Sequence, residues 1–160
     1  MKIRALTPAD RLWVSEAVSR HFASTRIVSR GVLHDCSELT GLAAVRGVTP
    51  CGVLLYAIHE GECEVVVLLS LARRIGVAAA LLASVRRVAR AAGCRRLWLI
   101  TTNDNQAAID FYSSRGWSLK AVHRNAVSEA RRIKPELPLF GHNGVPIRDE
   151  LEFELLLDTA

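Results

Sequence analysis

The sequence has no long hydrophobic run. No stretch of its 160 residues approaches the roughly 18 consecutive apolar residues that a membrane-spanning helix needs. The first residues, from Met1 to Ala5, also lack the apolar segment of a secretory signal. We therefore expect a cytoplasmic protein with no membrane partner.

Cysteine and histidine are few and show no ligand spacing. The four cysteines include no Cys-x-x-Cys pair, and two of them lie in apolar runs that are typical of buried strands. The five histidines form no pair on one helical face and no cluster with cysteine. These patterns predict reduced thiols in the core and no structural metal.

The chain is basic but lacks the motifs of nucleic-acid-binding proteins. Its formal charge is +5 and its pI is about 9.4, which suggests an anionic partner. The arginines from Arg86 to Arg96 have no aromatic residues between them to stack on bases, and no helix-turn-helix, zinc finger or RNP pattern is present. A solvated basic face is thus favoured over a nucleic-acid surface.

The residues that are present suffice for one folded domain. Half of them are hydrophobic, so a chain of this length can bury one core. No repeat or low-complexity linker divides it. We predict a single domain over residues 1–160.

The N-terminal part begins with a strand and a helix. A strand is expected over Lys2–Leu6, and Thr7 then offers an N-cap, followed by Pro8 and an acid, Asp10, in the first turn. The helix should run to about Phe22. Its expected buried face carries Leu12, Trp13, Ala17 and Val18.

The next segment, Ser24–Glu38, is mixed and polar. Ser29-Arg30-Gly31 is typical of a turn, and the pattern as a whole predicts a loop or a short helix. Such a segment could line a substrate pocket. Three β-rich runs with turns between them follow, and they predict an antiparallel meander over Leu39–Val45, Cys51–His59 and Cys63–Leu69.

The pattern then changes to a helical period. An apolar stripe with 3.6-residue spacing begins near Ile75 and ends at Gly93, which makes this the strongest helix of the chain. The remaining expected elements are a strand over Arg96–Thr101, a helix over Gln106–Ser114, a strand over Trp117–His123, a short basic helix over Val127–Lys134, a loop over Pro135–Pro146 and a strand over Leu151–Leu157. The order predicts an α+β fold, with a βαβ-like unit joined to the meander around a mixed central sheet.

The segment Arg73-Arg74-Ile75-Gly76-Val77-Ala78 lies between a strand and the start of the strongest helix. A helix start presents unpaired N–H groups, and small residues such as Gly76 and Ala78 let a phosphate approach them. Arg73 and Arg74 can bind phosphate oxygens in a bidentate manner. The segment therefore predicts a pyrophosphate site. The alternative is a solvated loop with a tight turn at Gly76.

Two motifs in this region resemble a known family. Arg73, Gly76 and Ala78 match the Gln/Arg-x-x-Gly-x-Gly/Ala signature of the GNAT superfamily of acyl-CoA-dependent N-acyltransferases. Asn105, Ala108, Tyr112 and Gly116-Trp117 match the family pattern Asn-x-x-Ala-x-x-x-Tyr-x-x-x-Gly-aromatic. The resemblance covers roughly residues 63–117. It implies a mixed, mostly antiparallel sheet flanked by helices, with splayed fourth and fifth strands.

The resemblance also implies a role for each matching residue. Acetyl-CoA would be the acyl donor, and its pyrophosphate would be held by backbone amides of Ile75, Gly76, Val77, Ala78 and Ala79. Leu68 and Leu69 would pair with the pantetheine arm like an added strand. Asn105, within the motif that includes Ala108, would bond the pantetheine or the adjoining backbone.

Tyr112 is implied to be the general acid. Attack of an amine on a thioester expels a thiolate, which leaves more readily when a nearby donor protonates it. The alternative is a tyrosine that is buried for structural reasons only.

The general base is less clearly marked. Glu62 and Glu64 alternate along the fourth expected strand, so both project from one face and either could accept a proton from the amine through water. The alternative is a solvent-facing pair at the start of the strand. His123 is a further candidate.

The polar segment between His123 and Glu150 could form a lid over the acceptor site, and a surface connection is the simpler alternative. Within it Asp149 and Glu150 could attract a cationic amine, unless they simply lie at the surface.

The predicted function is acetyl transfer from acetyl-CoA to a primary amine by direct attack. The sequence leaves open whether the acceptor is a small amine, an antibiotic or a protein amine. The alternative is a non-catalytic acyl-CoA sensor or interaction module, which would not depend on Tyr112. The resemblance is also compatible with a homodimer through the C-terminal strands, which nothing in the residue pattern requires.

Overall fold

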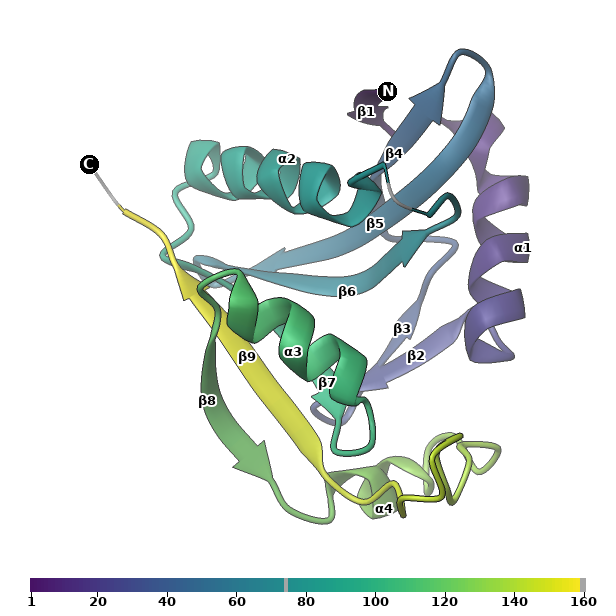
Figure 1. Cartoon of the computed structure of the whole chain (residues 1–160), viewed down its shortest axis with the longest axis vertical. Coiled ribbons are helices and arrows are strands. Elements are labelled where there is room, and N and C mark those ends of the chain that lie inside the picture. Colours follow the sequence, from purple (N-terminus) through teal and green to yellow (C-terminus); the bar gives the residue numbers. More distant parts are fainter. Residues whose placement is uncertain (74, 159–160) are drawn as a thin grey trace. The chain divides into compact units, whose positions relative to one another are not determined.

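Residues 26–70 form consecutive strands, and strands and helices alternate from there to residue 130 (Figure 1). The computed structural model describes residues 1–73 and 75–158. The chain divides into two compact units. The first unit comprises Met1–Ile27, His34–Leu97 and the residues from Leu157 on, and the second unit comprises Val28–Leu33 and Trp98–Leu156. A single domain over residues 1–160 stays a prediction.

The first unit contains the predicted antiparallel meander. Its strands lie in the order β1-β4-β5-β6, with bounds β1 (Lys2–Ala5), β4 (Thr40–Arg46), β5 (Thr49–His59) and β6 (Glu62–Ser70). The turn between β5 and β6 uses Glu60 and Gly61, both with positive φ, which suits a tight hairpin between twisted strands. The three predicted strands are confirmed to within two residues at each end.

Helix α1 (Arg11–Phe22) follows a short 3-10 helix over Pro8–Asp10. Its buried residues pack on one face of the meander, in a core formed by Val14, Ala17, Val18, Cys36, Val53, Leu55, Val67 and Leu69. The expectation for Leu12 was wrong, because its side chain is 73% exposed. At 100° per residue Leu12 lies about 200° away from Val14, and Val14 takes the inward position instead.

Helix α2 (Val77–Ala91) packs against the other face of β5. Side chains alternate along a strand, so Gly52 faces away from its neighbour Val53 in the α1 core. A Cβ on Gly52 would overlap Val77 and approach the Leu69 carbonyl oxygen at 2.9 Å. The missing side chain therefore lets α2 lie directly on the sheet. The predicted stop at Gly93 is confirmed, with φ of 78°.

The prediction of a loop or short helix over Ser24–Glu38 was wrong. It forms a β-hairpin of β2 (Arg26–Ser29) and β3 (Val32–Asp35). The turn is where the sequence predicted it, at Arg30-Gly31, with φ of 48° and 77°. Four-residue strands are too short to show a clear alternation of apolar and polar residues, which is why the hairpin was missed.

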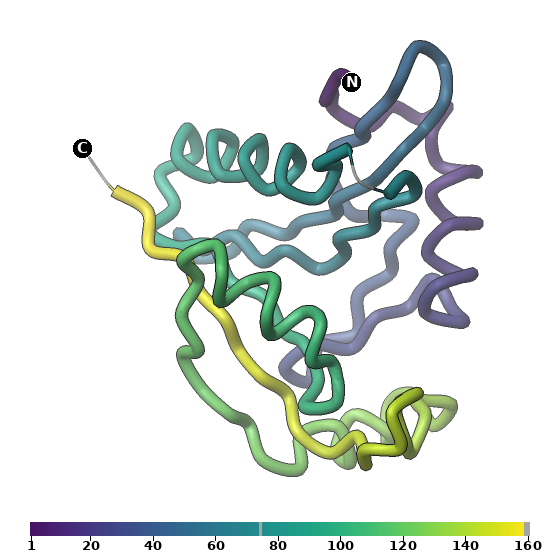
Figure 2. The backbone as a smooth tube through the Cα atoms, viewed as in Figure 1, coloured from purple at the N-terminus to yellow at the C-terminus, as the bar shows by residue number. Residues whose placement is uncertain are grey.

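The second unit contains most of β7 (Arg96–Thr102), then α3 (Gln106–Ser114), β8 (Ser118–His123), α4 (Ala126–Ala130) and β9 (Glu150–Leu156), with the strand order β7-β9-β8. Helix α4 is shorter than the predicted Val127–Lys134, because the N–H groups of Arg132 and Ile133 bond carbonyls only three residues back. Between α4 and β9 the chain runs without helix or named strand (Figure 2).

The predicted fold class, a mixed and mostly antiparallel sheet flanked by helices, is confirmed. All four cysteines are free and buried, as predicted. In the described part of the chain, no helix is long and apolar enough to cross a membrane.

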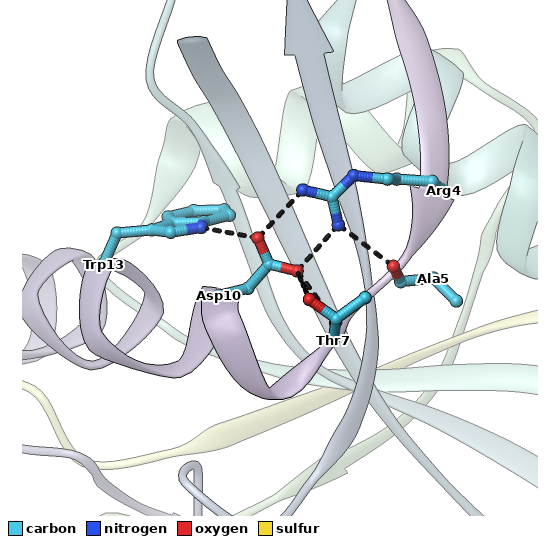
Figure 3. A network of polar contacts seen from close by, with 5 residues as sticks. All are labelled: Arg4, Ala5, Thr7, Asp10 and Trp13. Atoms are coloured by element: carbon cyan, nitrogen blue, oxygen red, sulfur yellow. Dashed lines mark hydrogen bonds and ion pairs between the residues drawn. The ribbon is translucent and has the colours of Figure 1, made fainter. Parts of the chain in front are cut away.

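A buried carboxylate ties β1 to the start of α1 (Figure 3). Asp10 accepts two hydrogen bonds from the Arg4 guanidinium, at 2.7 and 2.9 Å, and one from the indole N–H of Trp13 at 2.9 Å. It also accepts the backbone N–H of Thr7 at 2.8 Å. These donors, Arg4 first, hold the pKa of Asp10 well below its usual value.

We predict that Asp10→Ala lowers the free energy of unfolding at pH 7 by about 2–3 kcal/mol, since a cap and charge-assisted bonds are lost together. A lowered folded-state pKa stabilises the fold above the unfolded pKa of about 3.9 and loses that effect as the pH falls further. Urea unfolding should show the difference from wild type shrinking between pH 7 and pH 3. Glu16→Ala, on the exposed side of α1, is the control; an Asp10 effect equal at both pH values would contradict this account.

Candidate active site

In the loop between β6 and α2, two hydrogen bonds follow the end of the strand, and a glycine N-cap starts the helix. The Leu71 N–H donates to the Cys51 carbonyl at 2.8 Å, and the Ser70 hydroxyl donates to the Ala72 carbonyl at 2.8 Å. Gly76 is the N-cap of α2, with φ of 71°, a left-handed conformation that favours glycine. The space around it is open, with no atom within 4 Å of a Cβ built there.

The start of α2 carries free donors. The first hydrogen bond of the helix runs from the Ala80 N–H to the Gly76 carbonyl at 3.0 Å, so the N–H groups of the three residues from Val77 to Ala79 have no acceptor within the helix. No acid lies in this first turn. Because the helix begins at Val77, Ile75 and Gly76 belong to the loop rather than to the helix.

The positive end of α2 and these donors fit a phosphate group. Arg73, beside them in the chain, is exposed. Arg74 lies outside the described residues. These donors lie in the first unit, and the small residues Gly76 and Ala78 stand beside them. Binding of a pyrophosphate there stays a prediction.

Strand β6, which leads into this loop, is bonded to β5 along its length. Leu68 lies opposite Leu54, and Leu69 lies opposite Val53. The Leu69 side chain is 6% exposed and belongs to the α1 core. A role of Leu69 in binding a ligand is therefore restricted to its backbone.

Glu62 is engaged by two arginines. One of its carboxylate oxygens lies 2.5 Å from Nε of Arg96, and the other lies 2.9 Å from a guanidinium nitrogen of Arg95. Arg95 also donates to the Glu60 carbonyl at 2.8 Å. This arrangement fixes the β5–β6 turn to the start of β7 and occupies both carboxylate oxygens of Glu62.

Glu64 has a different environment. It is 6% exposed, and one of its carboxylate oxygens lies 3.3 Å from Nε2 of His34 on β3. That nitrogen is buried and makes no hydrogen bond among the described residues. A buried carboxylate next to an imidazole can take up or pass on a proton. Sequence reasoning missed His34, because the hairpin that carries it was not recognised and thirty positions separate the two residues.

Cysteine chemistry is not favoured next to Glu64. Burial, followed by the effects of Cys94 and Glu64, raises the pKa of the Cys63 thiol to about 12. The thiol therefore stays protonated at neutral pH, and a protonated thiol is a weak nucleophile.

In the second unit, Asn105 is the N-cap of α3. Its side-chain oxygen accepts the Ala108 N–H at 3.1 Å, which explains why these two motif positions are three residues apart. The amide –NH2 of Asn105 stays available for another acceptor, as it has no partner among the described residues.

Tyr112, near the end of α3, is packed among aromatic rings. It is 8% exposed, and its ring lies 5.1 Å from Phe111, 5.3 Å from Trp117 and 6.1 Å from Phe153, measured between centroids. Burial raises the pKa of its phenol to about 12. The hydroxyl therefore keeps its proton at neutral pH, and it makes no hydrogen bond to any described residue.

The second unit also contains an open cavity of about 720 Å³. Arg30 and Gly31 of the β2–β3 turn line one side of it, and His123, Arg124, Ile133 and Glu150 contribute to the others. The two segments that the sequence associated with a substrate, Ser24–Glu38 and His123–Glu150, therefore share one cavity. His123 is paired there, with its Nε2 2.9 Å from a Glu152 carboxylate oxygen.

The mixed, mostly antiparallel sheet flanked by helices is the fold of GNAT acetyltransferases. The model of the acetyltransferase (GNAT) family matches residues 8–117. The chain belongs to this family, and it is an acyltransferase.

The chain is also similar to a curated relative in sequence and to solved structures in fold. The chain is 39% identical over 146 residues to the uncharacterized protein YdhI of Bacillus subtilis (strain 168), with 91% of each chain covered. Its fold is similar to that of a GNAT family acetyltransferase from Elizabethkingia anophelis with acetyl-CoA bound, with a TM-score of 0.71, 15% identity and 98% and 97% of the two chains covered. It is also similar to the ribosomal-protein-S18-alanine N-acetyltransferase of Escherichia coli, with a TM-score of 0.70, 17% identity and 99% and 95% covered.

Proposed function

We propose that the protein transfers an acetyl group from acetyl-CoA to a primary amine by direct attack of that amine. The observation that carries the proposal is the cradle at the start of α2, with its free N–H groups and Gly76, in a chain of the acetyltransferase family. The acetyl-CoA-bound relative supports the choice of donor.

In this proposal the N–H groups from Ile75 to Ala79 hold the pyrophosphate, and Arg73 and Arg74 add positive charge. The backbone of Leu68 and Leu69 pairs with the pantetheine arm, and Asn105, capping α3 at Ala108, offers its free amide –NH2.

Glu64 is the proposed base. Both carboxylate oxygens of Glu62, the second candidate, already accept hydrogen bonds from arginines. Glu64 is buried, with one carboxylate oxygen 3.3 Å from Nε2 of His34, and a water can carry the proton from the amine to it. The protonated Cys63 thiol beside it favours direct transfer over an acyl-cysteine route.

Tyr112 is the proposed acid. Its raised pKa keeps the phenol protonated, and the hydroxyl has no competing partner among the described residues, so it can donate to the leaving thiolate. A chain that only sensed acyl-CoA would need the cradle but not this hydroxyl.

The first prediction concerns the cradle. Asparagine and aspartate both tolerate the left-handed conformation of Gly76, and both fit the open space there, so the two variants differ in charge alone. Gly76→Asp should weaken CoA binding at least tenfold relative to Gly76→Asn, because a carboxylate would repel the pyrophosphate. Titration calorimetry measures both dissociation constants. Equal dissociation constants for the two variants would contradict pyrophosphate binding at this loop.

The second prediction separates the two glutamates. Glu64→Gln should lower kcat/KM for the amine about 100-fold, the lower end of what a general base contributes. Glu62→Gln should lower it less than threefold and should instead reduce the melting temperature, because Arg95 and Arg96 lose a charged partner. A larger loss of kcat/KM in Glu62→Gln than in Glu64→Gln would identify Glu62 as the base instead.

The third prediction concerns Tyr112. Tyr112→Phe should lower kcat about 100-fold with little change in the affinity for CoA, since only an unbonded hydroxyl is removed. Thiol release across an amine panel measures the rate, and Tyr56→Phe is the control with the other tyrosine of the chain. An unchanged rate would remove Tyr112 as the acid. A wild type that binds CoA but releases no thiol with any amine would favour the sensor.

A further inference from the structure

The cavity of the second unit has fixed walls. Arg30, in the β2–β3 turn, donates both its backbone N–H and its guanidinium to one Glu150 carboxylate oxygen, each at 3.2 Å. Next to the lining residues Arg124 and Ala126, the Asn125 N–H donates to the Asp149 carboxylate at 2.9 Å. Arg30 and Asn125 both have positive φ, so each carboxylate holds a residue in an uncommon backbone conformation.

The segment between α4 and β9 is also fastened. Arg131 donates to the carbonyls of Pro138 and Ile147, at 2.7 and 2.8 Å. The Val127 N–H donates to the Arg148 carbonyl at 2.9 Å. These bonds hold the segment against α4, so the cavity is formed without a ligand.

The carboxylates that line the cavity, Glu129 and Glu150, each already have an arginine partner. Glu150 is 3% exposed and bound to Arg30, so neither it nor Asp149 is the free surface acid that would attract a cationic amine. Glu129 is exposed and lies 3.9 Å from Arg132, a weak pair at the surface.

The basic groups remain available. Arg30 keeps 40% of its side chain exposed while Glu150 holds its guanidinium in place. Arg124 is exposed and has no ion-pair or hydrogen-bond partner among the described residues. Three arginines thus line the cavity against two glutamates, and Val122 and Ile133 add apolar surface. A fixed guanidinium and a free one suit a carboxylate or a phosphate, which accept such donors in a bidentate manner.

We propose that this cavity binds an acidic group, a carboxylate or a phosphate, carried by the amine that the enzyme acetylates. The inference rests on the proposed function and deepens it, because it names the chemical class of the acceptor. Arg30 and Arg124 are the residues that recognise the acidic group, and Glu150 is a positioning residue that acts through Arg30.

Matched pairs of amines test this directly. The pairs are ω-amino carboxylates against alkylamines of equal length, α-amino acids against their amides, and phosphoethanolamine against ethanolamine. In at least one pair the acidic member should have a kcat/KM at least tenfold higher, and the pair that shows it distinguishes carboxylate from phosphate. Arg124→Gln should reduce that ratio about tenfold. Arg20→Gln, an exposed arginine on α1, should leave the ratio unchanged.

A binding measurement makes the test independent of turnover. Arginine side-chain NMR signals are followed while propionate or inorganic phosphate is added to the full chain. Arg30 and Arg124 should shift with at least one of the two anions, and the Arg30 shift should diminish in Arg124→Gln.

Absence of any shift at Arg30 and Arg124, or equal kcat/KM within every pair that turns over, would overturn the acidic subsite. Neither result would affect acetyl-CoA binding or turnover of neutral amines. Failure of CoA to bind at all would instead contradict the proposed function.

Discussion

The close approach of α2 to β5 at Gly52 is the constraint on which the donor-binding half of the structure depends. Any larger residue there would meet Val77, the first residue of the helix, and the backbone of β6. Gly52 therefore sets how closely the first residue of α2 can approach the sheet. Gly76 directly precedes Val77, and its left-handed conformation turns the chain into the helix. The space beside Gly76, at the first turn of α2, is open. Two glycines in different elements thus produce one cradle.

Neighbouring charges decide what each carboxylate does. Asp10, Glu62 and Glu150 each accept bonds from an arginine. Asp10 joins β1 to the start of α1, whereas Glu62 and Glu150 join segments that are distant in the sequence. Glu64 instead lies beside a histidine, with one carboxylate oxygen 3.3 Å from Nε2 of His34. The carboxylates therefore differ in their partners: three are paired with arginine, and one is buried next to an imidazole.

Much of the fold could be predicted because its signals are local. The stripe from Leu81 to Ala89 has a helical period over several turns, and the strands of the meander are bounded by Gly-containing turns. The short hairpin at Arg26–Asp35 and the inward face of α1 could not be predicted in the same way. Four-residue strands carry too little pattern, and the choice of Val14 over Leu12 depends on which face meets the sheet.

The sequence by itself determined the family-defining features, since Gly76 and the spacing from Asn105 to Tyr112 follow from local backbone geometry and helix capping. Tertiary structure alone decided the rest. It placed Glu64 next to His34 and Glu62 between two arginines. It also paired the buried Glu150 with Arg30, whereas Arg124 has no ion-pair partner among the described residues. These outcomes depend on contacts between residues up to 120 positions apart, and no spacing along the chain encodes which charge ends up neutralised and which stays available.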